Sequence, residues 1–199
     1  MKAVVLAGGR GSRMGELTDH QPKALIPIAG RPLIVYSLLA AKECGITSAT
    51  IILGYRGDQI KDTIGKGASL DMDIDYVHQL KEKMDPARII AVSVDAQSEV
   101  LGLNCDALIA PREYQAMMDI YLQERVDGCI LLDPARSAAP TSIGIYGPRL
   151  LEDLRTKTLD AILEERQRSV RGYIPRHMMN VNDAPGIALA EAFVREMRL

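Results

Sequence analysis

Strand-like and helix-like stretches alternate along the whole chain, and this alternation restricts the fold more than any other feature. Short apolar runs, such as residues 3–6 and 49–53, have the length and composition of buried strands. Between them lies a segment with helix punctuation, which Pro32 opens and Gly45 follows. Because such alternation favours a mostly parallel sheet with helices on both faces, we expect a three-layer, Rossmann-like α/β sandwich.

Further segments of both kinds continue the pattern to the end of the chain. Strands are expected at residues 73–77, 100–103, 129–132, 142–146 and 178–181. Helices are expected at residues 57–65, 87–94, 111–125 and 159–168 and from Pro185 onward, with a loop over 132–142. No linker, repeat or low-complexity tract divides the 199 residues, so a single domain over 1–199 is expected. Open sheets of this kind bind ligands beyond the carboxyl ends of their strands.

The first apolar run leads directly into a glycine-rich loop with interleaved arginines. Gly8, Gly9 and Gly11 let the backbone turn sharply and bring its N–H groups close to an anion. Arg10 and Arg13 add planar, permanently charged donors that suit phosphate oxygens. The sequence therefore predicts a phosphate-binding loop at the end of the first strand.

This loop is part of a longer motif, LAGGRGSRMGELTDHQPKALIPIAGRPLI at residues 6–34, in which Lys23 adds a separate cation. The motif matches neither the dinucleotide fingerprint nor the Walker loop. It closely resembles the signature of the nucleotidyltransferases that activate phosphorylated small molecules, LAGGxGxRM followed by PKALIPIxGRPLI. The resemblance continues through ILGYRGDQIKDTIGKG, DIDYVHQ and LGLNCDALI, and it ends at NVNDAPGIALAE. Residues 80–98 and 133–176 match poorly.

The resemblance implies a glycosyltransferase-A-like fold and the transfer of NMP from an NTP to a phosphorylated acceptor, with release of pyrophosphate. It assigns Arg13 to the β- and γ-phosphates and Lys23 to the charge around the α-phosphate and the acceptor phosphate, as catalytic residues. Gly54 and Gln79 stand where relatives contact the base, although a plain polar strand end explains both nearly as well. The implied nucleotide contacts are Leu6, Ala7, Gly8, Gly9, Arg10, Gly11, Ser12, Arg13, Gly54 and Gln79.

A magnesium ion is also implied, because Mg²⁺ takes one or two protein oxygens together with phosphate oxygens and water. Asp106 closes an apolar run and is the expected anionic ligand, with a helix cap or turn as the alternative. Asn182 matches the second metal position, where many relatives carry Asp. Asn180 and Asp183 are competitors for that position, and capping of the last helix by Asp183 is the alternative reading.

The acceptor and the base are left open by the sequence. Sugar-phosphate enzymes usually have a Gly-Thr-Ala-like turn after the Gln, whereas this chain has Met84-Asp85-Pro86-Ala87. In length and ending the chain is nearer to the GTP-dependent guanylyltransferases of molybdenum cofactor and of adenosylcobinamide phosphate. Its beginning resembles the enzymes that act on sugar 1-phosphates, phosphocholine and inositol phosphate. A non-catalytic, nucleotide-binding regulatory protein of the same fold is the other alternative.

Composition narrows the setting and the partners. A net charge of −2 argues against a nucleic-acid surface, and no membrane span or signal peptide is recognised. Cys44, Cys105 and Cys129 are widely spaced and follow no metal pattern, so buried free thiols in a reducing compartment are expected. We therefore expect a cytoplasmic protein with an NTP and a phosphorylated small molecule as partners. A homodimer is one option for the oligomeric state.

Overall fold

A seven-stranded sheet forms the centre of the computed structural model, which describes residues 1–79, 84–95, 97–165 and 169–199. The strand order is β10-β8-β9-β6-β1-β4-β5. Neighbouring strands run parallel, except that β9 is antiparallel to both β6 and β8. The strands are β1 (Lys2–Ala7), β4 (Ser48–Leu53), β5 (Asp73–His78), β6 (Val100–Asn104), β8 (Gly128–Asp133), β9 (Ala139–Tyr146) and β10 (Val170–Tyr173). The expected mostly parallel sheet is confirmed.

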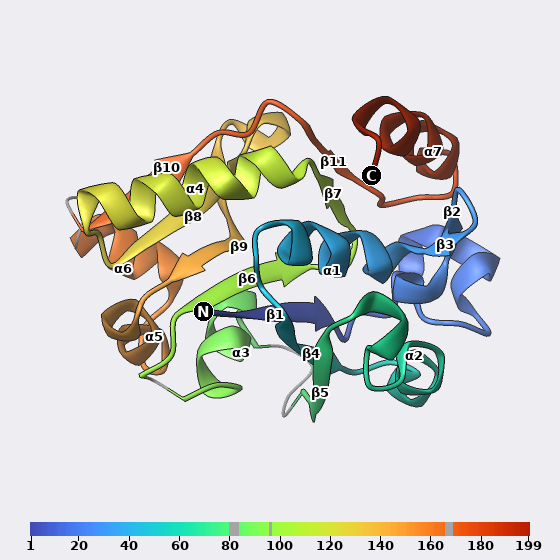
Figure 1. Ribbon diagram of the computed structural model, residues 1–199, viewed down its shortest axis with the longest axis horizontal. Coiled ribbons are helices and arrows are strands. Elements are labelled where there is room, and N and C mark those ends of the chain that lie inside the picture. The colour runs from blue at the N-terminus through green and yellow to red at the C-terminus, as the bar shows by residue number, and fades with distance from the viewer. Residues whose placement is uncertain (80–83, 96, 166–168) are drawn as a thin grey trace.

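Helices cover both faces of this sheet. They are α1 (Leu33–Glu43), α2 (Gly57–Ile64), α3 (Pro86–Val92), α4 (Pro111–Glu124), α5 (Pro148–Leu154), α6 (Leu159–Glu165) and α7 (Gly186–Met197). One hydrophobic core joins the sheet to α1, α2 and α4, and a second joins the opposite face to α3, α5 and α6. Figure 1 shows α1 and α4 on one side and α3 and α5 on the other. The three-layer arrangement predicted from the sequence is therefore confirmed.

The alternation of side chains along β1 shows why two cores form. Ala3, Val5 and Ala7 are buried in the first core, whereas Val4 is buried in the second. Because successive side chains of a strand point to opposite faces, a strand that is apolar at every position must be covered on both. The apolar first run of the sequence thus requires a central position in the sheet, and β1 lies between β6 and β4.

A third hydrophobic cluster attaches the C-terminal segment to the first part of the chain. Strand β11 (Met178–Asn180) pairs antiparallel with β7 (Ala107–Ile109), and β2 (Pro27–Ile28) pairs with β3 (Arg31–Pro32). Ala190 of α7 is buried in one cluster with Ile28 and Leu33. Figure 1 shows α7 beside this small hairpin. Short 3-10 turns complete the described part of the fold, at η1 (Ser12–Thr18), η2 (Lys23–Leu25), η3 (Ala68–Leu70) and η4 (Pro134–Arg136).

The predicted loop over 132–142 is wrong, because η4 and the first part of β9 occupy it. Pro140 and its small neighbours are typical of a loop. In the structure Pro140 pairs only with Leu132 of β8, since β6 pairs with β9 from Gly144 onward. A proline is tolerated there because no second neighbouring strand needs its missing N–H. Strands β7 and β10 and helix α5 were also not predicted, and residues 166–168 of the expected helix over 159–168 lie outside the described residues.

The strand order reverses next to β1. The chain proceeds from β1 outward to β4 and β5, and then returns to the other side of β1 with β6. The carboxyl ends of β1 and β6 therefore flank a topological switch point, which is where open α/β sheets bind ligands. The glycine-rich loop follows β1, and Asp106 follows β6.

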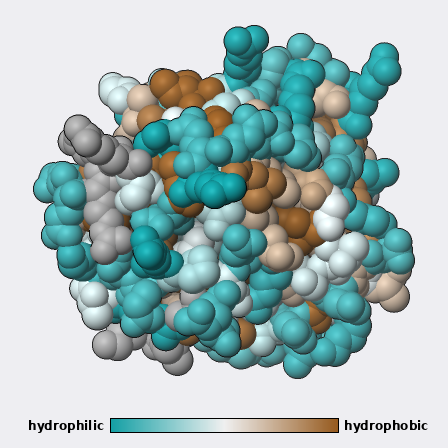
Figure 2. Space-filling view, turned by 60° about the vertical axis from the view of Figure 1, so that its left-hand side comes forward, coloured by the Kyte–Doolittle hydropathy of each residue, from teal (hydrophilic) through white to brown (hydrophobic). Residues whose placement is uncertain are grey.

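The molecular surface is mostly hydrophilic on the face seen in Figure 2, with apolar residues in small groups. Among the residues that the structure describes, no helix combines the length and hydrophobicity needed to cross a bilayer.

Candidate active site

The glycine-rich loop turns away from β1 and packs against the stem of a lysine. Gly11 has a φ of 73°, in the left-handed region that glycine adopts without strain. A Cβ atom added to Gly11 would lie 2.8 Å from Cβ of Lys23. Glycine is thus needed at position 11 for both conformation and space. The glycine-rich loop therefore packs directly against Lys23, which follows Gly11 by twelve positions in the sequence.

The residues that follow β4 and β5 also lie close to this loop. The backbone oxygen of Gly8 accepts a hydrogen bond from the N–H of Tyr55 at 3.0 Å. A Cβ atom added to Gly54 would lie 2.3 Å from that same oxygen, and one added to Gly8 would lie 2.5 Å from Oε1 of Gln79. Gly54 and Gln79, the predicted base contacts, therefore lie directly beside the predicted phosphate loop.

Four side chains from distant parts of the sequence converge at the switch point. Nζ of Lys23 donates to Oδ2 of Asp106 at 2.7 Å and to Oδ1 of Asn182 at 3.3 Å. Arg13 donates to the same Asn182 oxygen at 3.0 Å. The Lys23 side chain is 8% exposed and that of Asp106 is 29% exposed, so the pair sits at the bottom of an open cleft. All four residues assigned by resemblance to catalysis or metal binding are thus brought together.

Asn182 reaches this cluster because β11 runs beside the strand that follows Asp106. Asn180 pairs with Ala107, and the N–H of Val181 donates to the backbone oxygen of Asp106 at 2.9 Å. The side chain of Asp183 instead accepts from the N–H of Gly186 at 2.9 Å, at the start of α7. Asp183 therefore has the capping function that was its alternative reading.

The donor set fits a magnesium ion. The oxygens of Asp106 and Asn182 that face Lys23 point to one cationic position, 2.7 and 3.3 Å away. No group of three or more His, Cys, Asp or Glu side chains suited to a metal occurs among the described residues. A metal held here would therefore complete its shell with phosphate oxygens and water, which is the usual behaviour of Mg²⁺.

A first cavity of about 430 Å³ opens beside the glycine-rich loop. Several predicted nucleotide contacts line it, namely Leu6, Gly8, Gly9, Gly11, Ser12, Arg13 and Gln79, together with Lys23 and Asp106. Ala7 is instead buried in the core. Arg10 pairs with Asp19 at 3.3 Å and lies over the ring of Tyr55, where it lines an adjacent cavity that also includes Gly54.

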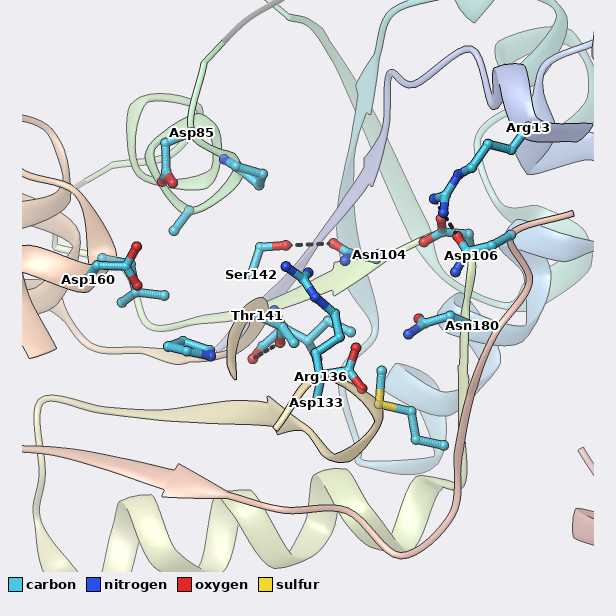
Figure 3. A pocket seen from close by; sticks show the side chains of 17 residues that line it. Arg13, Asp85, Asn104, Asp106, Asp133, Arg136, Thr141, Ser142, Asp160 and Asn180 are labelled. Atoms are coloured by element: carbon cyan, nitrogen blue, oxygen red, sulfur yellow. Dashed lines mark hydrogen bonds between the residues drawn. The ribbon is translucent and has the colours of Figure 1, made fainter. Parts of the chain in front are cut away.

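A second cavity, of about 450 Å³, lies on the other side of Asp106. Figure 3 shows its lining side chains, which come from η1, β6 and the turn after it, the start of α3, the β8–β9 hairpin, α6, and β11 with the segment that follows it. The two cavities share Arg13, Pro86, Asn104, Asp106 and Ser142. Two compounds bound in them would therefore meet at Asp106.

Most residues of the second cavity were not found by sequence reasoning. Ser142 donates to Oδ1 of Asn104 at 2.9 Å, across the antiparallel pair β6–β9. Asp133 and Arg136 come from the hairpin turn that was predicted as a loop. The available signal was the position of Asn104, two residues before Asp106 at the end of the same apolar run.

The neighbouring thiol is structural. Cys105 lines the first cavity but is only 8% exposed, and burial raises the pKa of its thiol well above the ordinary value. The three cysteines are free, as expected.

Together these features define an α/β protein that can hold phosphates at the switch point of its sheet. The chain belongs to the family described as the MobA-like NTP transferase domain, which matches residues 3–177. The fold is also similar to a crystal structure from Bacillus anthracis described as a glucose-1-phosphate thymidylyltransferase in complex with a sucrose. That similarity has a TM-score of 0.81 at 18% identity and covers 98% of this chain and 96% of the other.

Curated relatives match the N-terminal part more closely. The chain is 45% identical over 76 residues to the N-acetylmuramate alpha-1-phosphate uridylyltransferase of Neisseria meningitidis, covering 38% of this chain and 33% of the relative. It is 34% identical over 99 residues to a glucose-1-phosphate thymidylyltransferase of Streptomyces griseus, covering 50% of this chain and 28% of the relative. The matched segments thus span about a third or less of these relatives.

Proposed function

We propose that the chain transfers an NMP group from an NTP to a phosphorylated small-molecule acceptor and releases pyrophosphate. The observation that carries this proposal is the meeting of two polar cavities at Arg13 and Asp106. A reaction between two phosphate compounds needs this arrangement because each must reach the same point from its own side.

In the proposed step, an oxygen of the acceptor phosphate forms a bond to the α-phosphorus of the NTP. The bond from that phosphorus to the bridging oxygen of the β-phosphate breaks, and pyrophosphate leaves with its electron pair. The nucleophile is already an anion, so no proton has to be removed. Charge neutralisation and alignment are therefore the main requirements.

The residues of the cleft suit these two requirements. The N–H groups of the glycine-rich loop and Arg13 would bind the β- and γ-phosphates, and Lys23 would stabilise the charge around the α-phosphate. Asp106 and Asn182 would hold Mg²⁺, which supplies further neutralisation of the phosphate oxygens when it is bound. Gly54 and Gln79 would contact the base.

Sugar 1-phosphates are the acceptors that we propose first. Relatives of the chain are named for uridylyl, thymidylyl and cytidylyl transfer, and their names include glucose 1-phosphate and N-acetylmuramate 1-phosphate. These names support the sugar-phosphate interpretation over the guanylyltransferase alternative. The four converging side chains of the site argue against a non-catalytic regulatory role, because nucleotide binding alone needs no metal pair.

The test is a screen of purified protein with UTP, dTTP, CTP, ATP and GTP against glucose 1-phosphate, N-acetylmuramate 1-phosphate and choline phosphate. We expect Mg²⁺-dependent pyrophosphate release with at least one pair, and loss of that release on addition of EDTA. Binding of NTPs without release from any pair, confirmed by the absence of NDP-sugar formation, would favour the regulatory alternative.

We also propose that the protein acts in the cytoplasm. Cys105 and Cys129 are buried free thiols, and the half-buried Cys44 is also free. Thiols of this kind are usual in a reducing compartment.

A further inference from the structure

The second cavity contains one arginine that the proposed mechanism does not use. Arg136 is the last residue of η4, at the tip of the β8–β9 hairpin. Its guanidinium points into the cavity, towards the side on which Ser142 and Asn104 lie (Figure 3). Among the described residues it takes part in no ion pair or hydrogen bond, in contrast to Arg13, which donates to Asn182.

Hydrogen bonds within the hairpin turn hold the backbone on both sides of Arg136. Oδ1 of Asp133 accepts from the N–H of Ala135 at 2.9 Å, and its backbone oxygen accepts from the N–H of Ala138 at 2.9 Å. Ser137 and Ala138 both have positive φ angles, 53° and 58°, which close the turn tightly. Arg136 thus extends from an anchored backbone rather than from a long loop.

Carboxylates outnumber cationic side chains in the lining of the second cavity. Asp85, Asp106, Asp133 and Asp160 contribute carboxylates to its lining, and Arg13 and Arg136 are its cationic residues. Arg13 lines both cavities and already donates to Asn182, and the proposed function assigns it to the triphosphate, whereas Arg136 lines only the second cavity. A phosphate monoester that entered the second cavity would meet mainly negative charge unless Arg136 bound it.

We infer that Arg136 binds the phosphate of the acceptor, in addition to the contacts with the triphosphate that are proposed for Arg13 and Lys23. This inference rests on the proposed function. The planar guanidinium can donate two parallel hydrogen bonds to one phosphate, whereas a lysine offers a point charge. Arg136 would orient the acceptor oxygen towards the junction of the two cavities.

Steady-state kinetics of Arg136→Ala and Arg136→Lys test the inference directly. With the acceptor found in the screen, Arg136→Ala should raise the acceptor KM by about 10- to 100-fold, the range expected for a lost charge-assisted contact. The KM for the NTP should stay within about twofold of wild type. The acceptor KM of Arg136→Lys should lie between those of wild type and Arg136→Ala. An unchanged acceptor KM, or an equal rise in both KM values, would overturn the assignment.

Arg149→Ala is the matched control. Arg149 is exposed on α5, which follows the end of antiparallel β9 at the opposite edge of the sheet from the cleft. Its removal should change neither KM. Both variants remove an exposed arginine, so a general effect of lost positive charge would affect them alike.

A binding measurement separates this inference from the proposed function. The Nε–H resonance of Arg136, identified by its loss in Arg136→Lys, is followed while inorganic phosphate is added to wild-type protein. The triphosphate site is filled with an α,β-methylene NTP. A saturable shift of this resonance would support the assignment even if no acceptor turns over, whereas a failed screen would count against the proposed function alone. Saturable shifts elsewhere in the cleft with none at Arg136 would contradict it.

Discussion

Nζ of Lys23 lies 2.7 Å from Oδ2 of Asp106 and 3.3 Å from Oδ1 of Asn182, so one ammonium group contacts both predicted metal ligands. An ammonium ion and a divalent cation would compete for these oxygens. In the free protein the lysine balances the Asp106 carboxylate. Under the proposed function, the oxygens of a bound triphosphate would offer Lys23 another partner.

Metal binding by the nucleotide-free protein should therefore be weak and should improve when the ammonium is removed. In Lys23→Met, the apolar side chain fills similar space and leaves Asp106 without its partner. We expect Mn²⁺, measured by electron paramagnetic resonance without nucleotide, to bind more tightly to this variant than to wild type. Lys42→Met, which removes a surface partner of Asp71, is the control. Weaker Mn²⁺ binding to Lys23→Met would refute this competition.

Turnover should nevertheless depend strongly on the lysine. We expect Lys23→Ala to lower kcat by about 100- to 1000-fold, comparable to the loss of one oxyanion-stabilising donor. Because the lysine is buried and paired, its removal should also lower the free energy of unfolding by about 1–3 kcal/mol. Rapid-quench kinetics and chemical denaturation measure the two effects. Wild-type turnover in the variant would remove Lys23 from catalysis.

The two proposed metal ligands should differ from a cap residue in their response to magnesium. Asp106→Asn should lose activity at low Mg²⁺ and recover part of it at high Mg²⁺, and Asn182→Ala should shift the Mg²⁺ dependence in the same direction. Asp183→Ala should mainly lower stability, by about 1 kcal/mol, because its side chain caps α7. Activity assays across a Mg²⁺ titration, with melting curves, distinguish these results. An unshifted Mg²⁺ dependence in Asn182→Ala would transfer the role to Asn180.

Glu113 gives the protein an acid-sensitive contact outside the cleft. This buried carboxylate accepts from the Tyr173 hydroxyl at 2.8 Å and the Arg176 N–H at 3.1 Å, and it lies 2.9 Å from Nδ1 of His177. Burial raises the pKa of Glu113, but hydrogen bonds from His177, Tyr173 and Arg176 outweigh burial and hold the pKa below its ordinary value of 4.5.

A carboxyl group whose pKa is lowered by folding stabilises the folded state above its unfolded-state pKa, and this contribution is lost as the pH falls through the folded-state pKa. The melting temperature of wild type should therefore fall as the pH decreases below about 4.5. Glu113→Gln should be less stable at neutral pH and should show a shallower acid limb. Parallel acid limbs for the two proteins would contradict the contribution of Glu113.

A second phosphate group on the acceptor should be unfavourable. Asp85, Asp133 and Asp160 line the second cavity and would repel it. If glucose 1-phosphate is a substrate, glucose 1,6-bisphosphate should have a kcat/KM lower by at least about tenfold, equivalent to about 1.4 kcal/mol. Asp160→Asn should narrow this difference. Equal use of both acceptors by wild type would show that these carboxylates do not select.

The sequence was sufficient where local pattern decides the structure. The apolar run before Gly8 predicted a buried strand, and Gly8, Gly9 and Gly11 lie in the loop that follows it. Both features could be predicted because side-chain alternation and glycine conformation are local properties. The convergence of Asp106 and Asn182 was expected from the family motif, and the structure brings both to Lys23.

The second cavity could not be predicted in the same way. Its lining depends on β9, which runs antiparallel between β6 and β8. The start of β9 contains Pro140, which is typical of a loop, so the sequence pattern did not predict a strand there. Asn104 and Ser142 are hydrogen-bonded across 38 residues of sequence, a contact that no local pattern specifies. Glu113 was likewise not singled out, because its partners lie 60 to 64 positions away in the sequence.

The antiparallel pairing of β11 with β7 has a consequence for biosynthesis. Asn182 joins Asp106 and Lys23 only after β11 has left the ribosome, whereas the glycine-rich loop and Lys23 emerge first. Strands β5, β4, β1 and β6 can pair in a growing chain that still lacks Asn182. Translation thus produces the glycine-rich loop and Lys23 well before β11, and the cluster of Lys23, Asp106 and Asn182 is complete only after β11 has been synthesised.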